Sequence, residues 1–88
     1  MAYFPENDEA YFTWIDNHSH GFVVNCHKKP AAGYLVLHRA SCKLIQRGRG
    51  STMTEGDYKK ACATDEQELH DWAATLNGVL TRNCSCRP

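Results

Sequence analysis

The sequence predicts a small α+β domain with a three- to four-stranded, mainly antiparallel sheet and two helices, held together by one zinc ion. Apolar residues recur at helical spacing in residues 8–17 and 64–76. Short β-prone segments, 22–27, 34–38 and 58–63, are separated by turn residues. Five cysteines and five histidines in 88 residues are more than buried thiols alone explain, and these are the side chains that bind zinc.

Residues 1–88 form one domain, because a chain of this length is too short for two hydrophobic cores. No apolar run approaches the ~18 residues that span a bilayer. Residues 1–8 are acidic and lack the basic start of a signal peptide. We therefore expect a cytoplasmic protein with no membrane partner, in a reducing compartment where disulfides are rare.

The first element is a helix over residues 8–17. Asn7 or Asp8 can accept the free N–H groups of its first turn. Tyr11, Trp14 and Ile15 fall at i, i+3 and i+4 and form one apolar stripe.

Two strands follow, over residues 22–27 and 34–38. The loop between them contains Pro30 and Gly33, and its length favours a β-hairpin. The apolar run Leu35–Leu37 predicts a central strand that is covered on both faces.

The second half begins with residues 39–57, which include a turn-rich segment from Gly48 to Thr54. A third strand is expected over 58–63. Thr64 then begins the second helix, with Gln67 completing a capping box. The apolar face of this helix consists of Leu69, Trp72, Ala73 and Leu76. Asn77 and Gly78 end it, and 79–81 is a candidate for a short further strand.

Four zinc ligands are expected among two short-spaced pairs and a cysteine between them: His38, Cys42, Cys62, Cys84 and Cys86. The order and direction of the strands decide whether Cys62 can bind the same zinc ion as His38 and Cys42. If the three strands are successive antiparallel neighbours, Cys62 lies at the opposite end from His38. If the third strand is parallel to the second, Cys62 joins His38 and Cys42. Cys26 is expected to be a core thiol, and the competing hypotheses are buried free thiols and a redox pair.

Catalytic motifs are missing from the sequence, so the chain is not expected to be an enzyme. It has no Gly-x-Ser-x-Gly elbow and no phosphate-binding glycine loop. Cys62 at the start of the second helix, where the helix dipole would lower the thiol pKa, is the one candidate for a Cys/His nucleophile pair. Cys62 with a distant cysteine is the candidate for a redox switch, although the sequence has no C-x-x-C motif. The remaining histidines, expected at the surface, are His18, His20, His27 and His70.

The net charge of zero conceals an uneven distribution. Residues 28–62 hold eight basic and two acidic residues, whereas the segments on either side are acidic. If the middle forms one surface, it attracts phosphate groups; the alternative is a solvated sheet face. The expected nucleic-acid-binding residues are Lys28, Lys29, Arg39, Lys43, Arg47 and Arg49.

Residues 20–88 resemble a small Cys/His-containing module of uncharacterised bacterial proteins. The motifs that carry the resemblance are Tyr34-Leu-Val-Leu-His-Arg-Ala-Ser-Cys42, Tyr58-Lys-Lys-Ala-Cys62, Leu69-x-x-Trp72 and Cys84-Ser-Cys86-Arg-Pro88. Some of these modules lie beside nuclease- or restriction-type domains, so the resemblance implies a reader or adaptor rather than a catalyst.

Taken together, the sequence favours a zinc-stabilised module that recognises nucleic acid, DNA in particular, through its basic middle. The alternative is a protein-interaction or tethering module with an aromatic patch of Tyr3, Phe4 and Trp14. A third hypothesis is a thiol redox sensor built on Cys62 and the tail cysteines.

Overall fold

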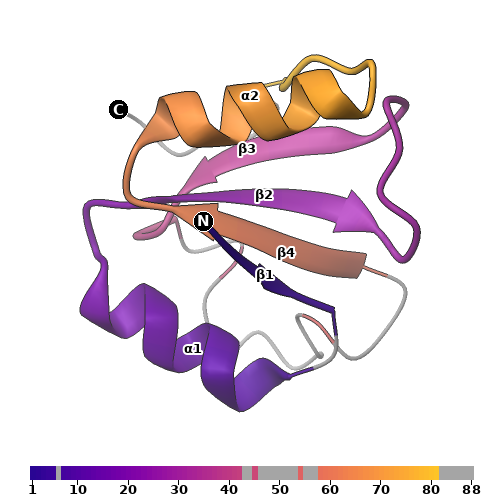
Figure 1. Ribbon diagram of the computed structural model, residues 1–88. Coiled ribbons are helices and arrows are strands. Elements are labelled where there is room, and N and C mark those ends of the chain that lie inside the picture. Colours follow the sequence, from indigo (N-terminus) through magenta and orange to yellow (C-terminus); the bar gives the residue numbers. More distant parts are fainter. Residues whose placement is uncertain (6, 43–44, 46–53, 55–57, 82–88) are drawn as a thin grey trace.

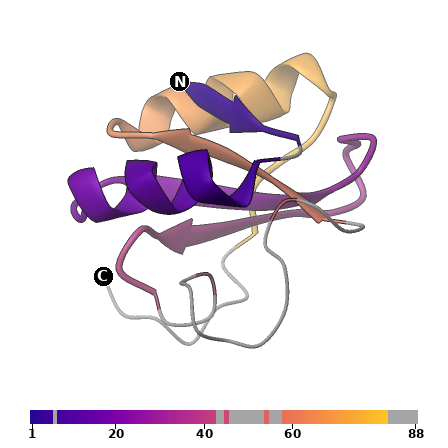
Figure 2. The same cartoon turned by 90° about the horizontal axis from the view of Figure 1, so that it is seen from below.

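The computed structural model of this protein describes residues 1–5, 7–42, 45, 54 and 58–81. Within them a four-stranded sheet lies between two helices, with α1 on one face and α2 on the other (Figure 1). Viewed from below, α1 lies in front of the sheet and α2 behind it (Figure 2). In chain order the elements are β1 (Ala2–Phe4), α1 (Asp8–Asn17), β2 (Phe22–His27), β3 (Leu35–Arg39), β4 (Tyr58–Ala63) and α2 (Glu66–Thr75). The predicted α+β class is confirmed.

The strand order is β1-β4-β2-β3, and all neighbours are antiparallel. Neither of the two arrangements considered from the sequence pairs β4 with β2, whereas the structure places β2 between β3 and β4. Both flanking strands are antiparallel to β2, so β3 and β4 run in the same direction. The C-terminal ends of β3 and β4 therefore lie at the same end of the sheet, on either side of β2.

The strand over Leu35–Arg39 is not central, which corrects the prediction made from its apolar run. It lies at the end of the strand order and is nevertheless buried. Its outer edge meets Thr81, which forms a parallel bridge with Val36. The Leu37 N–H donates to the Thr81 carbonyl at 2.8 Å, and the Thr81 N–H donates to the Leu35 carbonyl at 2.9 Å.

Both helices were predicted, and their caps follow ordinary rules. The Asn7 side chain accepts a hydrogen bond from Ala10 N at 2.9 Å, as expected for the start of α1. The N-cap of α2 is Asp65, which accepts from Gln67 N at 2.9 Å, and not Thr64. Asn77, at φ 58°, adopts the left-handed conformation that ends a helix.

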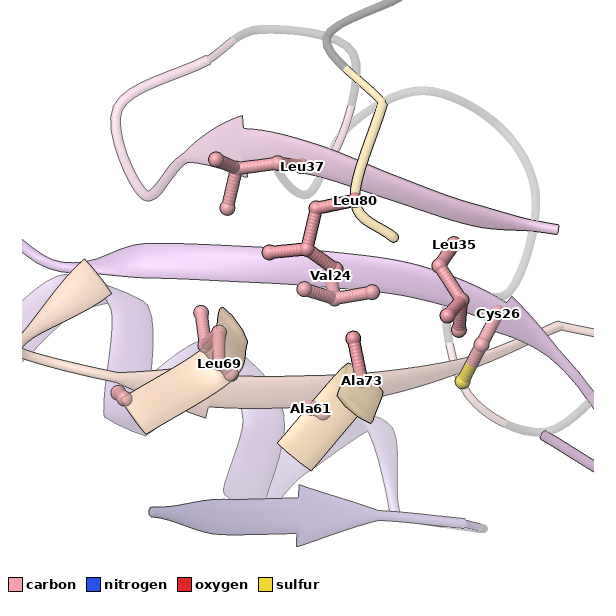
Figure 3. Packing of buried hydrophobic residues seen from close by; sticks show 9 residues of the cluster. Val24, Cys26, Leu35, Leu37, Ala61, Leu69, Ala73 and Leu80 are labelled. Carbon is pink, nitrogen blue, oxygen red and sulfur yellow. The ribbon is translucent and has the colours of Figure 1, made fainter. Parts of the chain in front are cut away.

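Each face of the sheet carries its own hydrophobic core. The core under α2 contains Val24, Cys26, Leu35, Leu37, Ala61, Ala63, Leu69, Ala73 and Leu80 (Figure 3). The core under α1 contains Tyr11, Ile15, Val23, Ala40, Cys42, Ile45 and Cys62. Cys26 is fully buried, which confirms its prediction as a core thiol. Alternation along each strand assigns every sheet residue to one of these faces.

Candidate functional site

One row of the sheet carries two of the predicted metal ligands. Val23 of β2 pairs with His38 of β3 on one side and with Cys62 of β4 on the other. All three side chains therefore point to the α1 face. Two strand spacings separate His38 from Cys62, which is about 10 Å between Cα atoms. Cys62 is thus at the same end of the sheet as His38, with the central strand between them.

His38 and Cys42 do come together. The Cys42 Sγ atom lies 3.6 Å from His38 Nδ1. His38 is the last but one residue of β3, and Cys42 follows through a turn in which its N–H donates to the Arg39 carbonyl at 2.9 Å. Both side chains are buried. We call these two residues the His38–Cys42 pair.

No three potential metal ligands gather within the described part of the chain. Cys84 and Cys86, two of the predicted ligands, lie outside the described residues. Burial, and then the charge of Lys60, lower the pKa of His38 to about 4. At neutral pH its imidazole is therefore uncharged, which is the form that binds a metal.

The predicted basic surface is divided in the described part of the chain. Lys28 and Lys29 are exposed in the turn after β2. Arg39 lies at the other end of the hairpin, where its guanidinium carbon is 5.8 Å from the centre of the Phe22 ring. The other three predicted residues, Lys43, Arg47 and Arg49, lie outside the described residues.

Two further lysines of the basic middle are buried and do not form a surface. The Lys59 Nζ atom donates to the Thr54 carbonyl at 2.6 Å, and the Lys60 Nζ atom donates to Asn25 Oδ1 at 2.6 Å. Their side chains are 5% and 3% exposed. The charge count along the sequence therefore overstates the positive charge that faces the solvent.

An aromatic row at the hairpin end of the sheet was missed by the sequence analysis. His27 pairs with Tyr58 of β4. Its ring centre lies 5.2 Å from that of Tyr58 and 4.6 Å from that of Tyr34, and the two tyrosine rings are 5.6 Å apart. We call these three residues the aromatic row. The register of the hairpin brings His27 opposite Tyr34, so the sequence could have predicted that these two residues lie side by side.

The aromatic row is accessible and is held by polar contacts. His27 is exposed, Tyr58 is 43% exposed and Tyr34 is half-buried. The Asn25 amide donates to the Tyr34 hydroxyl at 3.2 Å, and Asn25 is in turn held by Lys60. The exposed Lys28 follows His27 directly. Aromatic faces and ammonium groups thus share this end of the sheet.

No protein-family model, no curated protein and no solved structure matches this chain. The resemblance of residues 20–88 to a bacterial module therefore stays a prediction. Neither helix in the described part of the chain has the length and apolar character that crossing a bilayer requires.

The aromatic patch expected for a protein-interaction module is not assembled. Tyr3 faces α2, where its ring centre lies 6.3 Å from that of Trp72. Phe4 is on the opposite face and packs against Tyr11, with ring centres 6.0 Å apart. Trp14 stacks on His18 at 4.3 Å. Alternation along β1 separates Tyr3 from Phe4, so the three side chains do not share one surface.

Cys62 does not have the environment of a reactive thiol. It lines a pocket of about 220 Å³ at the start of α2, but its own side chain is 0% exposed. Burial raises the pKa of the Cys62 thiol to about 12, whereas the expectation from the following helix was a lowered pKa. Burial likewise raises the pKa of Cys26 to about 11. For both thiols, the cost of removing the thiolate from water outweighs the opposing effect of the nearby Lys60 charge.

We therefore expect Cys26 and Cys62 to resist alkylation by N-ethylmaleimide at pH 8 in the folded protein. The raised pKa values alone lower the thiolate fractions about 100-fold for Cys26 and about 1000-fold for Cys62. Peptide mapping by mass spectrometry measures each site, with the urea-unfolded chain as the reference. Rapid labelling of folded Cys62 would instead support the redox-sensor hypothesis.

Proposed function

We propose that this protein binds single-stranded nucleic acid at the aromatic row. The observation that carries the proposal is the contact of three rings, one from each of two strands and one from the hairpin loop, beside two exposed lysines. Bases stack on aromatic side chains for about 1–3 kcal/mol each, with little dependence on sequence. The exposed lysines that follow His27 in the chain would contact the phosphates.

The exposed aromatic rings favour single-stranded over double-stranded nucleic acid as the ligand. Base faces are hidden in a duplex and free in a single strand, so a stacking surface favours the single strand. Lys28 and Lys29 supply two phosphate contacts near the aromatic row. Arg39, at the far end of the hairpin, is not part of this proposed contact. Lys43, Arg47 and Arg49 keep their predicted role as phosphate contacts, which charge-reversal variants test.

The test is fluorescence anisotropy with labelled DNA and RNA 12-mers and the corresponding DNA duplex, at several salt concentrations. We expect Tyr58→Ala to weaken single-strand binding about 5- to 150-fold, the equivalent of one stacked base. Tyr58→Phe retains the ring and should bind like the unchanged protein. Lys28→Ala/Lys29→Ala should lower the salt slope by about 1.4, because each phosphate contact on a single strand contributes about 0.7.

A matched control separates local contacts from net charge. Thr13→Glu/Ser19→Glu changes the net charge by the same amount as the double lysine variant. Both positions are exposed, and Ser19 lies before the start of β2, away from the hairpin turn. We expect this control to bind nearly as tightly as the unchanged protein. Unchanged affinity in Tyr58→Ala, or tighter binding of the duplex than of the single strands, would contradict the proposal.

A further inference from the structure

We propose that the Tyr34 hydroxyl donates a hydrogen bond to a carbonyl oxygen of a bound base and thereby favours thymine or uracil over adenine. This contact depends on the proposed binding of single strands at the aromatic row, and it distinguishes between the bases that stack there. Three side chains in series, Lys60, Asn25 and Tyr34, set the direction of the hydrogen bonds behind it.

The series begins at a buried ammonium group. Lys60 Nζ donates to Asn25 Oδ1 at 2.6 Å. Because an ammonium has donors and no acceptor, the Asn25 atom that faces it must be the carbonyl oxygen. The NH₂ group of the Asn25 amide is therefore on the other side, and it donates to the Tyr34 hydroxyl oxygen at 3.2 Å.

The sheet holds Lys60 and Asn25 against each other. The two residues are directly paired between β4 and β2, so both side chains point to the α1 face. The Lys60 side chain is buried, and turning the Asn25 amide over would place its NH₂ group against the ammonium. Loss of this acceptor from a buried charged group is unfavourable, so the amide keeps one orientation while Lys60 is charged.

The Tyr34 hydroxyl is left with a hydrogen to donate. A phenol hydroxyl accepts hydrogen bonds and has one O–H to donate, and accepting from Asn25 makes it a better donor. In the described part of the chain it accepts from Asn25 and meets no acceptor for its own hydrogen. The hydrogen bond between Asn25 and Tyr34 is only partly buried, so the hydroxyl is not sealed from a ligand.

The inclination of the rings favours contact with the edge of a base. The Tyr34 ring is inclined by 51° to the exposed Tyr58 ring. A base that stacks parallel to Tyr58 therefore cannot stack on Tyr34 as well, and it meets the rim of that ring, where the hydroxyl lies. Thymine and uracil have a carbonyl oxygen at the position where adenine has an amino group. The Tyr34 O–H fits this oxygen, whereas the adenine amino group is itself a donor.

The test compares a thymidine 12-mer with a deoxyadenosine 12-mer by fluorescence anisotropy. The pH is 7, below the Lys60 pKa of about 8, so that the ammonium is present. For each protein the affinities for the two strands are expressed as a ratio, because changes in net charge act on both strands. We expect Tyr34→Phe, which keeps the ring, to lower the thymidine-to-adenosine ratio about 2- to 13-fold, the value of one hydrogen bond. Tyr58→Phe also removes a phenol hydroxyl and is the matched control, with an unchanged ratio.

A second variant reverses the direction of the series. Asn25→Asp has nearly the same shape, but its carboxylate only accepts, so the Tyr34 hydroxyl would donate to it instead of to a base. All three rings and Lys60 are retained. We expect a fall in the ratio similar to that of Tyr34→Phe, and circular dichroism shows whether each variant is folded.

The outcomes separate this contact from the proposed function. If neither 12-mer binds, the proposed single-strand binding fails. If both bind and Tyr34→Phe leaves the ratio unchanged, single-strand binding stands and the contact with the base is overturned. Equal weakening of both strands would in that case place the hydroxyl at the sugar–phosphate backbone. An unchanged ratio in Asn25→Asp alone would also overturn the proposal, because the series would not set the direction of the Tyr34 O–H.

Discussion

Replacing Tyr11 with alanine is expected to lower the free energy of unfolding by about 3–5 kcal/mol, the range for a large buried aromatic side chain. Tyr11 is 0% exposed and is the largest fully buried side chain among the described residues. Its ring lies 6.0 Å from that of Phe4 and 5.4 Å from that of Phe12. Small domains are stable by only about 5–15 kcal/mol, so this single change brings the fold close to its limit.

The Tyr11 hydroxyl adds a second, separable contribution. It donates to the Ile45 carbonyl at 2.7 Å in a buried contact, which fixes α1 to the connection between β3 and β4. Tyr11→Phe keeps the ring and leaves that carbonyl without its donor, at a cost of about 1–3 kcal/mol. Urea unfolding followed by circular dichroism measures both variants. Phe12→Ala, which removes a half-buried ring, is the control and should lose less than Tyr11→Ala. An equal loss in both would contradict the central role of Tyr11.

Lys60 is expected to make the protein more stable as the pH rises from 8 to 10.5, relative to a Lys60→Met variant. Its side chain is 3% exposed, and burial lowers its pKa from 10.5 to about 8. Between these values the unfolded chain holds a proton on Lys60 that the folded chain has lost. Raising the pH therefore favours the folded state, by up to about 3 kcal/mol over the whole interval.

The measurement is urea unfolding of both proteins at pH 7, 8.5 and 10. The Lys60 charge lowers the pKa values of Cys26 and Cys62, so the difference between the two proteins measures Lys60 together with its coupling to these thiols. At pH 7 the folded protein holds a buried ammonium that donates to Asn25 Oδ1 at 2.6 Å and lies 5.9 Å from the centre of the Tyr11 ring. Lys28→Met, at an exposed position, is the control and should show no comparable trend. A constant difference between Lys60→Met and the unchanged chain would contradict this account.

Local elements were predictable, because neighbouring residues decide them. The apolar stripe and the Asn7 cap define α1 at Asp8–Asn17, the range expected from the sequence. The hairpin of β2 and β3 follows from two β-prone segments and a short loop. The strand Ala2–Phe4 was missed, since three residues carry no periodicity. Residues 2–4 form a strand because they pair with the edge of β4 that faces away from β2.

The candidate site residues were also predictable only where neighbouring residues decide their positions. The His38–Cys42 pair could be read from spacing, because a single turn joins its members. The position of Cys62 could not, because it depends on which strand pairs with β2. Two members of the aromatic row, His27 and Tyr34, follow from the hairpin register, whereas Tyr58 joins them from a strand far along the chain. Lys60 contributes to the positive charge counted along residues 28–62, but the structure shows that its side chain is buried.

By itself, then, the sequence determined the helices, the hairpin and the residue types available for chemistry, since hydrogen bonds and side-chain periodicity act between near neighbours. The tertiary structure alone decided strand order, and with it which cysteines lie near His38 and which lysines are buried. The physical reason is that an antiparallel sheet can be ordered in several ways with the same local segments. The choice depends on how both of its faces and its edges are covered.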